Sequence, residues 1–208
     1  MHLRTKRILA TSLFAIGWIA AVAFGLGSLF QYENTPGPVG VLSQEWPNTQ
    51  IERTNDRPTL VMVAHPRCPC TVASIAELAR IMARLQGKVA ACVLLVKPNE
   101  SGPDWEETSL RRSAEAIPGV KVIFDRNGVE ARCFGAETSG HTFLFGADGH
   151  LLFSGGITAS RGHAGDNAGE SAIVALVNNQ TPPQTRSLVF GCSLANPVKT
   201  DSKALCLK

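Results

Sequence analysis

The sequence lacks a strong excess of charge of either sign. Its 208 residues carry a formal net charge of +3, and 18% of them are Asp, Glu, Lys or Arg. Nucleic-acid-binding domains often carry a stripe of Lys and Arg interleaved with aromatic residues, and this sequence has no such stripe. There is also no internal repeat. We therefore expect no nucleic acid among its partners, and one ordinary domain with short additions at its ends.

One segment has no charged side chain at all. It is the 23-residue run Ile8–Phe30, and a helix needs about 20 residues to cross the hydrocarbon core of a membrane. Glu33 follows the run, and basic or titratable side chains precede it: His2, Arg4, Lys6 and Arg7. This arrangement orients the N-terminus toward the cytoplasm. We predict a cytoplasmic stub and single membrane anchor over residues 1–30, with the rest of the chain on the extracytoplasmic (periplasmic) side.

A cleaved signal peptide is the alternative to an anchor. Ala21-Val22-Ala23 resembles a cleavage site, but the apolar cores of signal peptides are shorter, at about 7–15 residues. Export follows in either case. Cysteines in that compartment can form lasting disulfides.

The rest of the chain is predicted to form a linker, a domain and a tail. Residues 31–44 are rich in Pro, Gly and polar side chains, which is typical of a linker. Residues 45–180 alternate between short apolar runs and helical spacing, and residues 181–208 form a cysteine-containing tail. Strands are expected at 59–64, 88–96, 120–125, 142–145 and 151–154, and helices at 71–86, 104–117, 129–134 and 169–178. This order predicts an α/β domain, with a mixed sheet flanked by helices.

Cys68-Pro69-Cys70 lies where the first predicted strand ends and a helix begins. Unpaired backbone N–H groups and the helix dipole favour a thiolate there, lowering a pKa that is about 8.5 in a free cysteine. His65 and Arg67 add positive charge. We therefore predict thiol–disulfide exchange in which Cys68 attacks and Cys70 resolves. The alternative is that Cys68 and Cys70 serve only as small hydrophobic residues in the core. However, the edge of a parallel sheet where strands lead into helices commonly holds functional sites.

With these residues in place, the chain resembles the thioredoxin-like superfamily. It is most similar to membrane-tethered members related to TlpA and ResA, and among those to RedB-type proteins. The resemblance covers about residues 55–180. It depends on the dithiol, Gly140-His141-Thr142-Phe143-Leu144-Phe145, the turn 147–149, and residues 153–157 and 160–167. It implies a redox domain without a cofactor that acts on thiols or disulfides of exported proteins, built on a four- or five-stranded sheet.

Two features depart from the family pattern. The family has Cys-x-x-Cys, whereas a disulfide between Cys68 and Cys70 closes a small, strained ring that is easier to reduce. Such a pair is expected to be more oxidising or to act in isomerisation, unless Cys68 pairs with another thiol. The family also places a cis-proline before the fourth core strand, where it shields the dithiol and helps to exclude metals. Here Gly140 occupies that position, after Ser139.

The absence of that proline opens a metal-binding alternative. Cys68 and Cys70, with His65 or His163, would suit copper(I) or zinc, and some extracytoplasmic relatives deliver copper. Without a metal, Arg161 or His163 is expected to stabilise the Cys68 thiolate, and Asp166 to orient His163 or cap the last helix.

A thiol peroxidase that forms a sulfenic acid at Cys68 is a weaker alternative, because the Thr-x-x-Cys arrangement of peroxidatic sites is absent. Of the other cysteines, Cys92 is expected in the core. Cys133 is expected in a core or surface position, with a role as resolving partner as the alternative. Cys192 either folds back on the dithiol or pairs with Cys206, and the sequence leaves both open.

Overall fold

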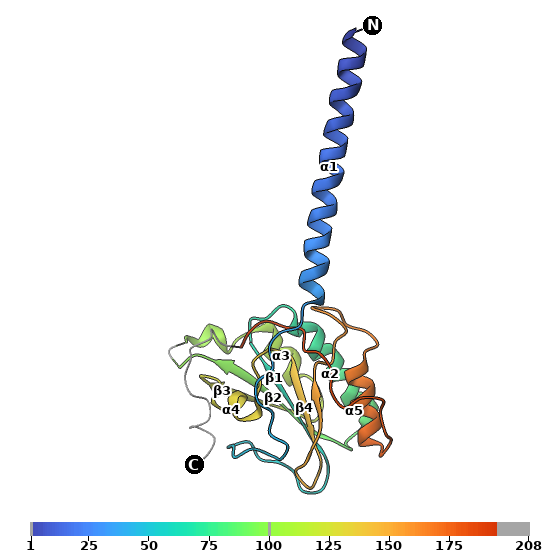
Figure 1. The fold of residues 1–208 in the computed structure, drawn as a ribbon. Helices are drawn as coiled ribbons and strands as arrows, with labels where there is room; N and C mark the ends of the chain where they lie inside the picture. Colours follow the sequence, from blue (N-terminus) through green and yellow to red (C-terminus); the bar gives the residue numbers. More distant parts are fainter. Residues whose placement is uncertain (1, 100, 195–208) are drawn as a thin grey trace. The chain divides into compact units, whose positions relative to one another are not determined.

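The computed structural model describes residues 2–99 and 101–194 in two units, the first ending at Thr35 and the second beginning at Pro36. The first unit is a single helix, α1 (His2–Asn34), drawn in blue in Figure 1. Its most apolar stretch has a mean hydropathy of 2.1. The helix is therefore long and apolar enough to span a membrane. It extends the predicted run at both ends, because no proline lies between His2 and Asn34.

The second unit contains a five-stranded mixed sheet in the order β3-β2-β1-β4-β5. Its strands are β1 (Thr59–Ala64), β2 (Ala90–Lys97), β3 (Val120–Arg126), β4 (His141–Phe145) and β5 (Leu151–Gly155). β1, β2 and β3 run parallel, whereas β4 pairs antiparallel with both β1 and β5. All six residues of β1 are buried, as expected for the central strand of a covered sheet. This confirms the predicted fold class and order of elements.

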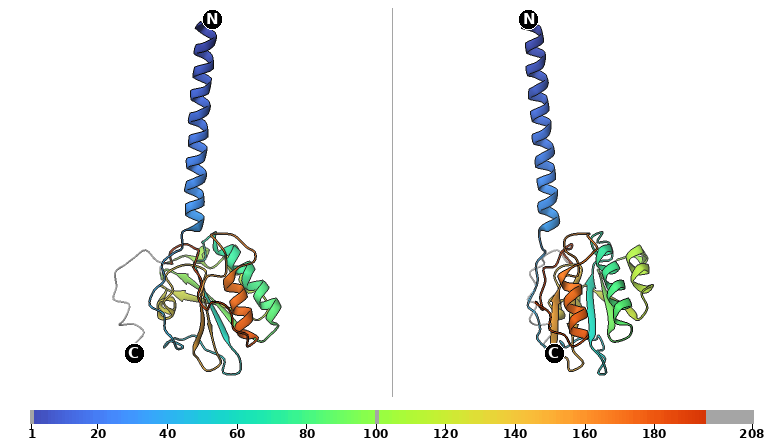
Figure 2. Two further views of the ribbon diagram at one scale, coloured as in Figure 1. Left: turned by 45° about the vertical axis from the view of Figure 1, so that its right-hand side comes forward. Right: turned by 90° about the vertical axis from the view of Figure 1, so that its right-hand side faces the viewer.

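Helices cover both faces of the sheet. They are α2 (Thr71–Leu85), α3 (Ser109–Glu115), α4 (Val129–Phe134) and α5 (Ala168–Val177), with a short 3-10 turn, η1 (Pro103–Trp105). One apolar core joins α2, α3 and α5 to alternate residues of the strands, and a second joins α4 to the residues between them. In Figure 2, α2 and α5 lie together on one side of the sheet.

Two helix starts differ from the sequence expectations. The helix expected over 104–117 is divided into η1 and α3, because the Thr108 side chain accepts a hydrogen bond from Arg111 N–H (3.2 Å) and begins a new helix. The cap of α5 is Asn167, whose Oδ1 accepts from Glu170 N–H at 2.8 Å. The capping role expected for Asp166 is therefore wrong.

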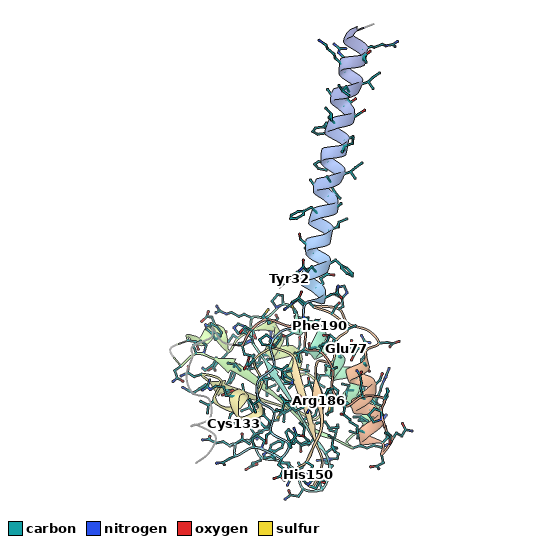
Figure 3. The ribbon with its side chains drawn as sticks, viewed as in Figure 1. Tyr32, Glu77, Cys133, His150, Arg186 and Phe190 are labelled. Atoms are coloured by element: carbon teal, nitrogen blue, oxygen red, sulfur yellow. The ribbon has the colours of Figure 1, made fainter. Side chains whose placement is uncertain are left out.

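The chain after α5 returns along the sheet. Thr185 O accepts from Ser154 N–H on β5 (3.1 Å), and Val189 O accepts from Gly37 N–H (2.8 Å). Val189 and Phe190 are both buried. In Figure 3, Phe190 lies at the end of the domain opposite His150, which is in the β4–β5 turn. The returning segment therefore reaches the end of the sheet where β1 leads into α2.

Candidate functional site

The dithiol lies in a tight loop between β1 and α2. Cys68 N–H donates to the His65 carbonyl (3.0 Å), and Thr71 N–H donates to the Cys68 carbonyl (3.2 Å). Cys70 is the residue immediately before the first turn of α2 and makes no side-chain capping bond. Cys68 is 2% exposed and Cys70 is 9% exposed. The two thiols are therefore at a helix start, as the sequence predicts, and are mostly covered.

A third cysteine from the returning segment completes the site. Cys192 Sγ lies 2.9 Å from Cys68 Sγ, and the sulfur atoms of Cys68, Cys70 and Cys192 all lie within 4.8 Å of one another. Of the two placements left open by the sequence, the structure has the one in which Cys192 folds back on the dithiol. Cys206 lies outside the described residues.

The surroundings of Cys68 favour its thiolate. Burial by itself raises the pKa of Cys68, but hydrogen bonds from the side chains of Cys192 and Thr71, and from their backbone groups, outweigh burial and hold the pKa below its ordinary value. Hydrogen bonds to the charged form are an effective way to stabilise a buried anion. Cys68 is therefore the group best suited to act as the nucleophile.

The other two thiols are held in the protonated form. Burial, followed by the hydrogen bond to Cys68 and the Cys68 charge, raises the pKa of Cys192. Burial and the Cys68 charge raise the pKa of Cys70, whereas the Arg161 guanidinium lowers it. Arg161 also donates a hydrogen bond to the Gly191 carbonyl, next to Cys192. Its positive charge therefore acts on the site, where it lowers the pKa of Cys70.

Two of the predicted supporting residues have other partners. The Arg67 guanidinium pairs with the Asp104 carboxylate and lies over the Trp105 ring, 4.4 Å from its centroid. His65 Nδ1 accepts from Arg67 N–H at 3.2 Å. Burial, together with the Arg67 charge, lowers the pKa of His65 and favours its neutral form. Both residues therefore shape the loop on the side of η1.

The segment just before β4 contacts the end of β1 and the loop that carries the dithiol. Ser139 Oγ accepts from His65 N–H (2.8 Å) and lies 2.6 Å from Thr71 Oγ1. Gly140 N–H donates to the Val63 carbonyl (2.8 Å), and Gly140 has a φ of +92°, which favours glycine. Sequence reasoning identified Gly140 but missed Ser139 and Thr71. Their hydroxyl groups carry no sequence motif, and only the tertiary fold brings them together.

The histidine ligands considered from the sequence are outside the thiol cluster. Within the described part of the chain, the three cysteines are the only group of three or more metal-ligating side chains that lies this close together. It includes neither His65 nor His163. His163 N–H donates to the Ser160 carbonyl (3.4 Å) in the loop before α5. A metal at this site would therefore be held by three sulfur atoms.

Cys92 and Cys133 lie outside the cluster of three thiols. Cys92 lies on β2 in the core, and burial raises its pKa to about 12. This confirms the expected core position. Cys133 is disulfide-bonded, and Figure 3 shows it well apart from Phe190. It therefore does not resolve Cys68 in this structure.

The sequence matches no protein-family model and no curated protein. A hypothetical protein from Sinorhizobium meliloti 1021 has a similar structure, with a TM-score of 0.58 at 17% identity over 75% of this chain and 96% of that chain. An uncharacterized conserved protein from Geobacillus kaustophilus gives 0.57 at 19% identity, over 81% and 97%. A thioredoxin-like protein in its oxidised form gives 0.47 at 14% identity, over 71% and 97%. Identities this low concern the fold alone, and that fold is the mixed sheet flanked by helices that the sequence predicted.

Proposed function

We propose that this protein is an extracytoplasmic thiol–disulfide oxidoreductase that uses Cys68 as its nucleophile. The observation that carries the proposal is the position of Cys68, which lies at the start of α2 with its Sγ 2.9 Å from a second thiol. A nucleophilic thiolate and a neighbouring thiol are the two groups that exchange requires. The lowered pKa of Cys68 supports the same assignment.

The exchange begins when the Cys68 thiolate attacks one sulfur of a substrate disulfide. A mixed disulfide forms between Cys68 and that sulfur, and the other substrate sulfur leaves as a thiolate. A second thiol of the site then attacks Cys68, which releases the first substrate sulfur and leaves the site oxidised. The same steps in reverse introduce a disulfide into a substrate.

We further propose that α1 is a single-pass anchor and that the substrates are thiols or disulfides of exported proteins. The basic residues before the apolar helix and Glu33 after it support this orientation. The motifs shared with TlpA-, ResA- and RedB-type proteins support the same setting, and we place the chain nearest to RedB-type proteins on that basis.

The test uses the full chain in detergent and a model disulfide. Cys68→Ser is expected to abolish exchange, because a hydroxyl group cannot replace the thiolate as the attacking group. Cys92→Ser is the matched control and should retain wild-type activity, because Cys92 is a core residue outside the site. Retention of full exchange activity by Cys68→Ser would rule out the proposal.

A second candidate function is the handling of a soft metal ion, and the three-sulfur cluster favours it. Thiolates prefer copper(I) and zinc, and three sulfur atoms within 4.8 Å are close enough to share one ion. Cys68, Cys70 and Cys192 would hold it. Purification without chelators should then yield about one equivalent of metal, lost in Cys192→Ser but retained in Cys92→Ser. Equal metal content in both variants would exclude a three-sulfur site.

A further inference from the structure

The segment that carries Cys192 is held in a fixed register beside the dithiol. Ser139 N–H donates to the Cys192 carbonyl (2.8 Å), and Leu194 N–H donates to the Glu137 carbonyl (2.9 Å). Between these two bonds, Thr138 and Ser193 form an antiparallel bridge. Backbone pairing of this kind fixes where each side chain lies along the partner segment. The closeness of Cys192 to Cys68 is therefore built into the fold.

Gly191 makes this register possible. A Cβ atom at Gly191 would lie 1.9 Å from the Ser139 carbonyl oxygen, so no larger residue fits without moving the backbone. Arg161 donates a hydrogen bond to the Gly191 carbonyl. Phe190 and Leu194, which flank this part of the segment, are both buried. Contacts before and after Cys192 therefore hold this segment in place.

The two candidate resolving thiols differ in the ring that they close. A disulfide from Cys70 to Cys68 spans a single intervening residue and is strained. Cys192 comes from a different segment, 124 positions along the chain, and its sulfur already faces Cys68 at 2.9 Å. It needs only a small side-chain movement to reach the S–S bond length of about 2.05 Å.

We propose that Cys192, and not Cys70, is the thiol that resolves Cys68. This inference rests on the proposed exchange function. In the first step, the Cys68 thiolate attacks a substrate disulfide, and one substrate sulfur leaves as a thiolate. Cys192 then gives up its proton to that departing thiolate or to solvent, and its sulfur attacks Cys68. The Cys68–Cys192 disulfide forms, the second substrate sulfur leaves, and two electrons have passed from the protein to the substrate.

The protonated state of Cys192 at rest is compatible with this role. Burial raises its pKa, but the next two causes are the hydrogen bond to Cys68 and the Cys68 charge. Both disappear once the Cys68 sulfur is part of a mixed disulfide, because the anion is gone. The Cys192 thiol therefore becomes easier to deprotonate at the step in which it has to react.

The test maps the disulfide in the full chain. The reduced protein in detergent is oxidised with hydroxyethyl disulfide, free thiols are blocked, and the protein is digested with trypsin without reduction. Trypsin leaves Cys68 and Cys70 together in residues 68–80 and Cys192 in residues 187–199. A Cys68–Cys192 bond joins these two peptides, whereas a Cys68–Cys70 bond stays within the first.

The expected product is the joined pair of peptides, in the wild type and equally in Cys70→Ser. Cys192→Ser is expected to lose the joined pair and to slow turnover of the model disulfide, whereas Cys92→Ser should match the wild type in both. Gly191→Ala is a second test, because it shifts the segment that carries Cys192 but removes no thiol group. It should lower the yield of joined peptides while Cys68 still forms the mixed disulfide.

A disulfide found within residues 68–80, with wild-type turnover in Cys192→Ser, would overturn this inference and make Cys70 the resolving thiol. The exchange function would stand in that case, provided that Cys68→Ser is inactive. Activity of Cys68→Ser would instead remove the proposed function itself. The two failures therefore give different results in the same set of variants.

Discussion

His141 is a fully buried side chain at the start of β4. Its ring stacks on Phe143 with 4.1 Å between centroids, and Nε2 lies 2.9 Å from Ser154 Oγ. Burial lowers the pKa of His141 to about 3. The folded state therefore keeps this ring neutral at a pH where the unfolded chain, with an ordinary histidine pKa of about 6.5, binds a proton.

From this we predict an acid-dependent loss of stability at His141. The contribution of the neutral ring is fully present above about pH 6.5. It is lost as the pH falls toward 3, at about 1.4 kcal/mol per pH unit in the free energy of unfolding. His141→Gln should remove this part of the slope when urea unfolding is measured between pH 4 and 7. His150→Gln is the control, because His150 is exposed. Equal slopes in His141→Gln and the wild type would contradict the prediction.

The three cysteines of the site differ in how well the sequence alone predicts their positions. Cys68 and Cys70 were identifiable because an apolar strand, a dithiol and a helical pattern follow one another directly. Cys192 was not placed, because it lies in a segment with little periodicity and its partner is 124 positions away. Its preceding Gly191 was visible in the sequence, but the close approach that requires a glycine there appears only in the folded chain.

At the scale of elements, α2 and α5 are joined by a pair of buried carboxyl groups. Glu77 on α2 and Glu170 on α5 are 0% and 2% exposed. Arg80 lies 3.0 Å from Glu77, and Arg84 lies 3.1 Å from Glu170. Burial is the largest cause that raises the pKa of Glu170; the Arg84 charge opposes it, and Glu77 adds to it. This pairing ties the helix that follows the dithiol to the last helix of the domain.

The raised pKa of Glu170 gives a prediction of opposite sign to that of His141. The folded state holds the proton more tightly than the unfolded chain, so this contribution to stability is present below a pH of about 4.3 and is lost as the pH rises. Glu170→Gln should therefore flatten the decline in stability as the pH rises above about 4.3, measured by urea unfolding. Glu115→Gln, at a partly exposed carboxylate on α3, should leave the slope unchanged. An unaltered slope in Glu170→Gln would contradict the expected titration.

The strands were the elements that sequence predicted best. Each β-strand was found within two residues of its expected bounds, because short apolar runs ending at Gly, Pro or Asn have few alternatives. The helix expected over 104–117 was divided into η1 and α3, because helical spacing carries no information on the Thr108 cap at which α3 begins. Local capping bonds of this kind outweigh a weak periodic pattern.

For the whole molecule, the apolar helix α1 and the domain that carries the three thiols are two distinct units. We predict that the full chain is recovered in the membrane fraction and that protease added outside spheroplasts degrades the domain. Removal of the positive charges at Arg4, Lys6 and Arg7 should reduce this orientation, because basic residues hold their flank in the cytoplasm. Protection of the domain until the cells are lysed would contradict the predicted sidedness. Recovery in the soluble fraction without α1 would indicate a cleaved signal peptide.

At the scale of the whole molecule, we expect the fold to hold the Cys68 sulfur as a thiolate. The most direct measurement is the rate of alkylation of Cys68 against pH in the reduced full chain, followed by peptide mass. We predict a midpoint below the value of about 8.5 that is usual for a free cysteine. The midpoint should rise in Cys192→Ala, which removes a hydrogen bond to the thiolate. A Cys68 midpoint at or above the usual value, unchanged by Cys192→Ala, would contradict the account.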